Sequence, residues 1–333
     1  MPYRLSENPE SARGVALDDV LSSLLSTIRL SGSLQFCFMP SGSWQTDATP
    51  AFNSLASSRG SGVIPFHIVA EGTCWLRFAD DQTTLEAGDV VLFPFGSGHQ
   101  LGSGRDGRLV TPTKDLPPKP WREVPLLRYG DDVAGVRMLC GYLQCEALGF
   151  SPFSRSLPEF VHVRPGASGG PSWLDSTVRQ MITEVDRPRA GSVSMVPRLT
   201  EIIFIEVLRH QIVTSAPRAV GWLAALADPS LSRCLSIIHE DPRREWSLEA
   251  LADAARISRS VFAERFRAVL DISPIQYVRE WRLYLASVAL ATTRQAIADI
   301  AFNAGYASEA SFNRAFARAY GAPPATWRAS AQS

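Results

Sequence analysis

The chain has 333 residues and a formal net charge of zero; 45% of its residues are hydrophobic and 20% are charged. This length is sufficient for two folded domains, and the composition excludes a disordered or fibrous protein. The sequence has no apolar run of the ~20 residues that span a bilayer, no secretion signal at its start, and five scattered cysteines. We therefore expect a cytoplasmic protein with free thiols and no membrane partner.

The first half of the chain predicts mostly strands. Residues 11–30 place apolar residues in a helical stripe, but from about Gly32 the pattern changes to short strand-like runs separated by turns. These runs are residues 34–38, 66–69, 74–78, 90–93 and 136–143. Residues 105–124, rich in Pro, Gly and charge, predict a loop. The arrangement predicts an antiparallel barrel or sandwich.

Two helices are predicted after a glycine-rich loop. The first covers residues 173–185, and the second, residues 196–213, is apolar on nearly every face. Such a helix is expected to be buried, either in the core of its own domain or between two subunits, and the sequence leaves both alternatives open. Residues 215–218 are expected to be a linker, after which a helix at residues 223–239 begins a second, helical domain.

The last third of the chain contains a tandem repeat with a period of fifty residues. The matching pairs are Ser258 and Ser308, Phe262 and Phe312, Phe266 and Phe316, Leu270 and Tyr320, and Pro274 and Pro324. Each copy has a short apolar helix, a tight turn, a serine that caps the next helix and aromatic residues four positions apart, which is typical of a helix-turn-helix. We predict two such units, at about residues 247–270 and 295–320, joined by a rigid helix from Pro274.

Two helix-turn-helix units in one chain indicate a protein that binds double-stranded DNA. The second helix of such a unit contacts base edges with its first turns, so its outward-facing residues are the candidate DNA contacts. They are Arg259, Ser260, Ala263, Glu264 and Arg267 in the first unit and Glu309, Ala310, Asn313 and Arg314 in the second.

The other faces of these two helices are predicted to form the cores of the units. The inward-facing residues are Val261, Phe262, Phe266 and Val269 in the first unit and Phe312 and Phe316 in the second. Charge is also segregated, because residues 243–328 contain twelve arginines, no lysine and eight acidic residues. This local excess of positive charge favours contact with nucleic acid.

The repeat region resembles a known family. Residues 246–328 are similar to the AraC/XylS family of bacterial transcription regulators, whose signature is matched by Ile300-Ala301, Ala304-Gly305-Tyr306, Ser308, Ser311-Phe312, Arg314, Phe316, Tyr320-Gly321, Pro323 and Trp327-Arg328. The resemblance implies two units that read successive major-groove segments. Glu264 stands where relatives often have an arginine. We therefore expect the second unit to determine which DNA sequence is recognised and the first unit to adjust the affinity for DNA.

The N-terminal half resembles a cupin-type sensor domain carried by part of that family. Gly88-Asp89, the apolar run after it, Gly96 and His99 are similar to the second half of a cupin motif, and His67 lies where the first half would be. The resemblance implies an α+β protein with three parts. They are an antiparallel cupin-like β-barrel with helices at residues 1–165, a helical dimerisation region and linker at 166–215, and an all-α DNA-binding domain at 216–333.

The histidines and cysteines of this half include candidate metal ligands. Cupin enzymes use a second histidine where Val69 stands here, and Glu71 comes too early, so we expect no enzyme activity and keep a cupin metalloenzyme with an accessory helical domain as the alternative. If the strands of two cysteines adjoin those of two histidines, the four side chains would make a Cys2His2 set that suits tetrahedral zinc. Oxidants attack zinc-bound thiolates, so such a site could also sense oxidation. The four residues are Cys37, His67, His99 and Cys140. The competing interpretations are ordinary core residues, or a barrel that binds a small organic effector.

Together these features predict a sequence-specific DNA-binding transcription regulator that forms a homodimer. An effector, a metal or thiol oxidation sensed in the cupin domain would favour one arrangement of the paired DNA-binding domains. If the protein is an activator, it is also expected to contact RNA polymerase.

Overall fold

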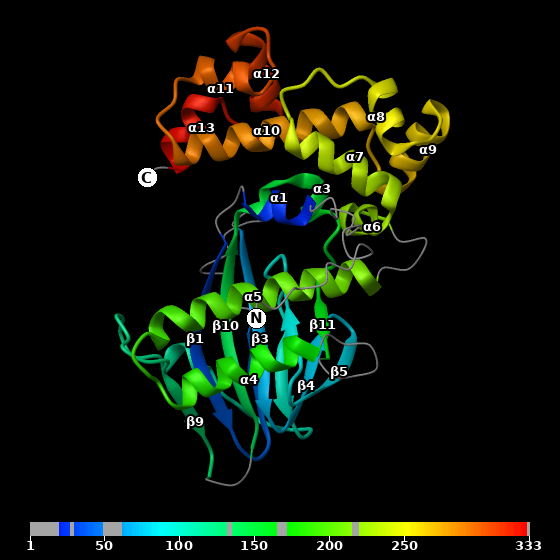
Figure 1. Ribbon diagram of the computed structural model, residues 1–333. Helices are drawn as coiled ribbons and strands as arrows, with labels where there is room; N and C mark the ends of the chain where they lie inside the picture. Colours follow the sequence, from blue (N-terminus) through cyan, green and yellow to red (C-terminus); the bar gives the residue numbers. More distant parts are fainter. Residues whose placement is uncertain are drawn as a thin grey trace, which may run out of the picture. The chain divides into compact units, whose positions relative to one another are not determined.

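The computed structural model describes residues 20–26, 30–48, 62–131, 135–164, 172–214 and 220–331. These residues form two compact units, a β-rich unit within residues 28–227 and a helical unit that joins α1 (Val20–Ser26) to the residues from 228 onward (Figure 1). The predicted α+β class, with a β-rich N-terminal part and an all-α C-terminal part, is confirmed. Within the described ranges, no helix combines the length and the apolarity needed to cross a membrane.

The β-rich unit contains two sheets. Six strands pair in the order β11-β6-β3-β10-β1-β9, and five pair in the order β5-β4-β7-β2-β8. The strands are β1 (Leu30–Pro40), β2 (Trp44–Asp47), β3 (Val63–Glu71), β4 (Thr73–Phe78), β5 (Asp81–Glu86), β6 (Val90–Leu92), β7 (Gln100–Ser103), β8 (Arg108–Leu109), β9 (Leu126–Tyr129), β10 (Arg137–Cys145) and β11 (Val161–Val163). Most pairs are antiparallel, as predicted, but β9 pairs with β1 and β8 with β2 in parallel. The described strands form two separate sheets rather than one closed barrel.

Apolar side chains from both sheets form the core between them. Phe38 and Met138 from the six-stranded sheet belong to one buried cluster with Trp44 and Leu76 from the five-stranded sheet. The rings of Phe38 and Trp44 meet edge to face with centroids 5.1 Å apart. Because side chains alternate along a strand, every second residue of β1, β3 and β10 faces this core and the residues between face the other side of the sheet.

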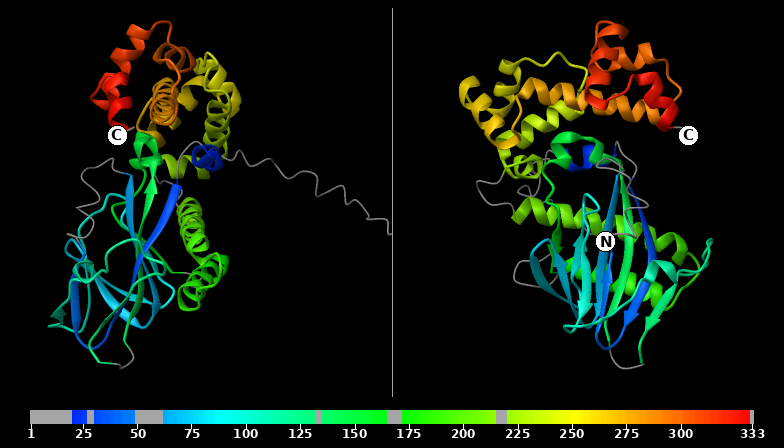
Figure 2. Two further views of the ribbon diagram at one scale, coloured as in Figure 1. Left: turned by 90° about the vertical axis from the view of Figure 1, so that its left-hand side faces the viewer. Right: turned by 180° about the vertical axis from the view of Figure 1, so that it is seen from behind.

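Two helices cover that other side of the six-stranded sheet (Figures 1 and 2). α4 (Ser172–Asp186) and α5 (Ser192–Thr214) pack against each other, and α5 lies along β1. A β-carbon at Gly32 would lie only 2.5 Å from Cβ of Thr200, so α5 approaches the strand backbone directly. α5 is buried on one side only, since Ile202 is 40% and Val213 83% exposed. Burial within this unit therefore does not account for all the apolar residues of α5.

Short elements complete the β-rich unit and correct two predictions. The predicted loop at residues 105–124 contains β8 and the 3₁₀ turn Pro112–Lys114, and η3 (Glu146–Gly149) and α3 (Ser151–Ser154) follow β10. The predicted helix at residues 223–239 is two helices, α6 (Trp222–Ala227) and α7 (Pro229–Glu240), because Asp228 caps the second by accepting from Ser230 N at 2.9 Å. α6 belongs to the β-rich unit and α7 to the helical unit. The predicted linker at residues 215–218 lies outside the described residues.

The helical unit is arranged around one long helix. Its helices after α7 are α8 (Leu248–Ala255), α9 (Arg259–Leu270), α10 (Pro274–Thr292), α11 (Ile297–Asn303), α12 (Glu309–Tyr320) and α13 (Pro324–Ala331). α10 runs between α8 and α9 at one end and α11 to α13 at the other, while α1 packs against α7 (Figure 1). Of the helical stretch predicted at residues 11–30, residues 20–26 are helical, Leu30 already begins β1, and residues 11–19 lie outside the described residues.

The close contact at Gly32 predicts a stability effect. The change Gly32→Val should lower the free energy of unfolding by about 1–3 kcal/mol, because the added side chain would force α5 away from β1. Urea denaturation of the full chain measures this difference. Ser31→Val is the matched control, since Ser31 is the preceding residue of the strand and is exposed. Equal stability of the two variants would contradict the direct packing of α5 on β1.

Candidate nucleic-acid interface

The first helix-turn-helix unit consists of α8 and α9. Ser247 caps α8, since its hydroxyl accepts from Ala250 N at 3.2 Å, and Arg256 ends the helix in the left-handed conformation with a φ of 58°. α9 then starts after Ser258 and points Phe262 and Phe266 inward, both fully buried. These two rings fix the rotation of α9 about its own axis.

The second unit repeats this construction with α11 and α12. Gly305, two residues after the end of α11, takes the left-handed conformation with a φ of 74°, and Ser308 caps α12 by accepting from Ser311 N at 3.2 Å. Phe312 and Phe316 are fully buried in a cluster with residues of α10 and α11. The repeat predicts the serine cap and the two inward-facing phenylalanines of this unit.

Arg282 on α10 links the two units, and the sequence analysis missed it. Its guanidinium donates to the carbonyl oxygens of Pro242 at 2.6 Å and Arg244 at 2.8 Å, in the turn that precedes the first unit. The same guanidinium lies over the turn of the second unit, where a β-carbon on Gly305 would be 2.7 Å from its Nη1. Both the left-handed turn and this close approach favour glycine at position 305. No sequence spacing signals such a contact across α10.

The predicted contact residues of α9 lie on its outer face, with one correction to the core assignment. Arg259, Ser260, Glu264 and Arg267 are exposed, and Ala263 is half-buried. Val261, predicted to face inward, is 51% exposed. It lies about 100° around the helix from Phe262 and farther from Phe266, so it cannot share their buried face.

In α12, three of the four predicted contact residues are exposed and the fourth is half-buried. Glu309, Ala310 and Arg314 are exposed. Asn313 is half-buried, and its Oδ1 is enclosed without a hydrogen-bond donor among the described residues. Its amide therefore lies at the boundary between the core and the outer face.

Ion pairs distinguish the two outer faces. Arg259 at the start of α9 pairs with Glu249 of α8 at 2.7 Å, and Arg265, which the sequence analysis did not select, pairs with Asp228 at 2.6 Å. Arg314 has no ion-pair partner in the described part of the chain. Its guanidinium is therefore available to a ligand without breaking an internal contact.

In the β-rich unit, three of the four residues proposed for zinc form one buried hydrogen-bonded chain. His99 Nδ1 lies 3.0 Å from the carbonyl oxygen of Ser97, which can only accept, so this nitrogen carries the proton. A neutral His99 then accepts at Nε2 from Nε2 of His67 at 2.8 Å, and His67 Nδ1 accepts from the thiol of Cys140 at 3.1 Å. All four ring nitrogens of the two histidines therefore have a partner, and so does the thiol proton.

Cys37 lies apart from these three residues, and this corrects the predicted site. In the sheet, Phe36 pairs with Cys140 and Cys140 with His67, whereas Cys37 pairs with Leu139. Cys37 is therefore on the opposite face of the sheet, where Arg137 Nε lies 3.5 Å from its sulfur. Since the ring nitrogens and the Cys140 thiol also bond to one another, these donors do not fit a Cys2His2 zinc site. No His, Cys, Asp or Glu cluster in the described ranges has a metal-site arrangement.

The cysteines also lack the properties of oxidant sensors. All five are buried and free. Burial raises the pKa of Cys74, Cys145 and Cys234 to about 12 and that of Cys140 well above its usual value. Burial raises the pKa of Cys37 as well, although Arg137 opposes the rise. The thiolate is the reactive form, so these environments disfavour oxidation.

Comparison with known proteins gives matches in both units. A model of the family described as "Cupin" matches residues 19–213, and a model described as "Helix-turn-helix domain" matches residues 251–330. An AraC-like transcription regulator of Streptomyces lividans is 32% identical over 330 residues, which are 94% of this chain and 97% of that protein. The HTH-type transcriptional regulator AlkR of Acinetobacter baylyi is 29% identical over 316 residues, which are 93% and 99% of the two chains.

Among solved structures, the DNA-binding domain of AdpA in complex with a target DNA is similar to part of this chain. The two are 28% identical, and the match covers 31% of this chain and 92% of that chain with a TM-score of 0.29.

The histidine pair predicts a pH dependence of stability. Burial lowers the pKa of His99 to about 4 and that of His67 well below its usual value. Below about pH 6.5 the unfolded chain binds protons that the folded chain does not, so stability should fall as the pH drops from about 6.5 toward 4. The change His99→Gln should reduce this slope by up to about 1.4 kcal/mol per pH unit.

Urea denaturation at several pH values measures the slope. The matched control is His210→Gln, which replaces a half-buried histidine of α5 outside the chain of hydrogen bonds. An unchanged slope in the His99→Gln protein would show that His99 takes up a proton in the folded state.

Proposed function

This chain belongs to the AraC-like family of DNA-binding transcription regulators, and from that membership we propose that it reads specific double-stranded DNA sequences with α9 and α12. The observation that carries the proposal is the repeat of one construction on the two ends of α10. Each copy holds a helix by two fully buried phenylalanines and leaves its polar residues outside. The first turns of such helices contact base edges in the major groove.

The two helices have different roles in this proposal. Arg314 has the length and charge to pair with guanine, and no internal ion pair holds it in the described part of the chain. Arg259 is already paired with Glu249, and Glu264 adds an exposed negative charge to the same face. α12 therefore sets most of the sequence preference, while α9 adjusts affinity.

The β-rich unit has the regulatory role in this proposal, as a sensor in a cytoplasmic protein. The hydrogen bonds among His67, His99 and Cys140 favour a structural role for these residues over metal-dependent catalysis, so we assign no enzyme activity. Exposed apolar residues of α5 support a homodimer that covers them. They are Met195 and Ile202, seven residues apart on one face of the helix. Activation through RNA polymerase stays a prediction from the sequence.

Arg314 gives the direct test of sequence reading. In a mobility shift on the DNA upstream of the protein's own gene, Arg314→Ala should lower specific affinity by about 1–3 kcal/mol and should relax the preference at one base pair. Arg318→Ala is the matched control, because Arg318 is an exposed arginine in the last turn of the same helix. It should weaken binding to all sequences alike. If both variants lose affinity equally and keep the same preference, Arg314 does not read a base.

Glu249 tests the role of the first unit. The change Glu249→Gln removes the carboxylate that pairs with Arg259, so DNA binding should tighten by up to about 1 kcal/mol at low salt and by less at high salt. Fluorescence anisotropy with labelled DNA measures the change. Asp253→Asn removes an equal charge from an exposed position on the same helix and serves as the control. Weaker binding by the Glu249→Gln protein would mean that the ion pair orients Arg259 for DNA.

A further inference from the structure

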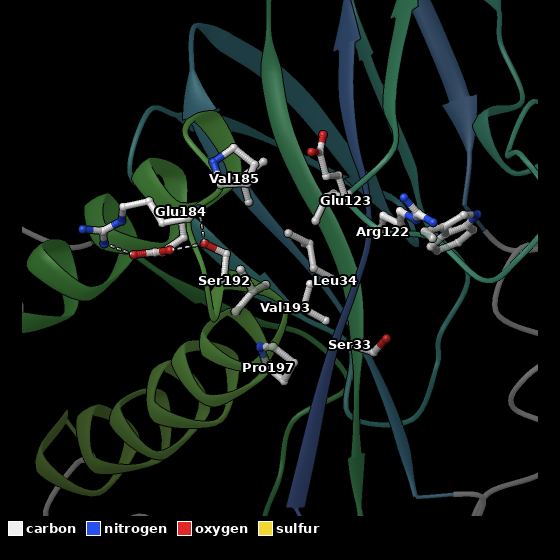
Figure 3. Close-up of a pocket in the computed structure, with 14 residues that line it drawn as sticks. Ser33, Leu34, Arg122, Glu123, Glu184, Val185, Ser192, Val193 and Pro197 are labelled. Atoms are coloured by element: carbon white, nitrogen blue, oxygen red, sulfur yellow. Dashed lines mark hydrogen bonds and ion pairs between the residues drawn. The ribbon is translucent and has the colours of Figure 1, made fainter.

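A cavity of about 400 Å³ lies in the β-rich unit, on the side of the six-stranded sheet that α4 and α5 cover. Its walls come from the start of β1, residues 121–124, the end of α4 and the start of α5 (Figure 3). This volume is at the lower end of the roughly 300–1,000 Å³ of small-molecule sites. The space between the two sheets, by contrast, is packed by the cluster around Phe38, Trp44 and Phe93.

Apolar side chains form somewhat more than half of the cavity walls. Leu34 from β1, Val185 from α4 and Val196 from α5 are buried, and Val124 and Trp121 are half-buried beside them. An aliphatic wall with one aromatic side chain favours an apolar or aromatic ligand.

The charged groups around the cavity are balanced. Glu184 is almost fully buried, and its carboxylate accepts from Gln180 at 2.9 Å, from Ser192 at 2.5 Å and from Arg189. Exposed Arg122 and Glu123 lie in the same lining segment and have opposite charges. The site therefore offers no net charge that would attract an ion.

Pro197 interrupts the helical hydrogen bonds of α5 next to the cavity. Pro197, inside α5, has no N–H group, so the carbonyl of Val193 one turn earlier lacks its helical donor. Both residues line the cavity and lie next to each other in it (Figure 3). A hydroxyl group on a ligand would supply the missing donor.

We propose that this cavity binds a small, uncharged, mainly apolar organic molecule that carries a hydrogen-bond donor, such as a phenol or an alcohol. This proposal rests on the proposed function, because it identifies the effector site of the regulator. A ligand there touches α4, α5 and β1 at once. It would stabilise the position of α5 that leaves the cavity open. The ligand would therefore raise the population of this conformation of the β-rich unit.

Calorimetric titration of the full chain with 2-naphthol tests the site. We expect saturable binding at one site, and weaker binding of naphthalene-2-sulfonate, which has a similar ring and a negative charge. Val193→Trp should fill the cavity and weaken 2-naphthol binding by roughly tenfold or more. Val213→Trp is the matched control, because Val213 is an exposed valine on the same helix and does not line the cavity. Val124→Trp is a second filling variant, from a different wall.

Every outcome decides the proposal. Absence of saturable 2-naphthol binding, tighter binding of the sulfonate, or equal loss in the Val213→Trp control would overturn it. So would unchanged binding in both filling variants, provided that circular dichroism shows them folded. A mobility shift on the same proteins separates this result from the DNA-binding proposal. If the unsubstituted protein does not bind DNA, the DNA-binding proposal is contradicted, and the calorimetric result for 2-naphthol is unaffected.

Discussion

The burial of two phenylalanines four residues apart is the constraint on which the DNA-binding unit depends. Phe262 and Phe266 in α9, and Phe312 and Phe316 in α12, are fully buried. Residues four apart lie on one face of a helix, so each pair fixes which face turns to the core and which to solvent. Arg314 lies two residues from both Phe312 and Phe316, about 200° around the helix from each, and is therefore the outermost position of the first two turns.

The same geometry explains which parts of the site could be predicted from the sequence. The fifty-residue repeat, the cap at Ser308 and the buried phenylalanine pairs are local patterns, and the structure has each of them where the sequence predicts it. Ser258, also predicted as a cap, precedes α9 but its side chain makes no capping hydrogen bond. The apolar side chain of Val261 favours a core position, but its place on the helix turns it outward. Asn313, about 60° from Phe316, is at the edge of the buried face, and a polar residue there gives no signal of partial burial.

Contacts between distant segments were not predictable in this way. Arg282 joins the turn at residues 242–244 to Gly305 across α10, and nothing in the local sequence marks it. In the β-rich unit, the strand of Cys140 lies between those of His67 and Cys37, so Cys140 is on a strand next to that of His67, as the sequence predicts, and Cys37 is not. The pairing register of these strands determines which face of the sheet each cysteine occupies, because an offset of one residue turns a side chain to the other face. Cys140 thus meets His67, while Cys37 meets Arg137.

The central claim is that α9 and α12 are held on one rigid support and enter successive major-groove segments on the same face of DNA. Methylation interference on the bound upstream DNA tests it most directly. The account predicts two groups of sensitive guanines about 10 base pairs apart, with the group at α12 lost in the Arg314→Ala protein. A single group, or two groups on opposite faces of the duplex, would contradict the account.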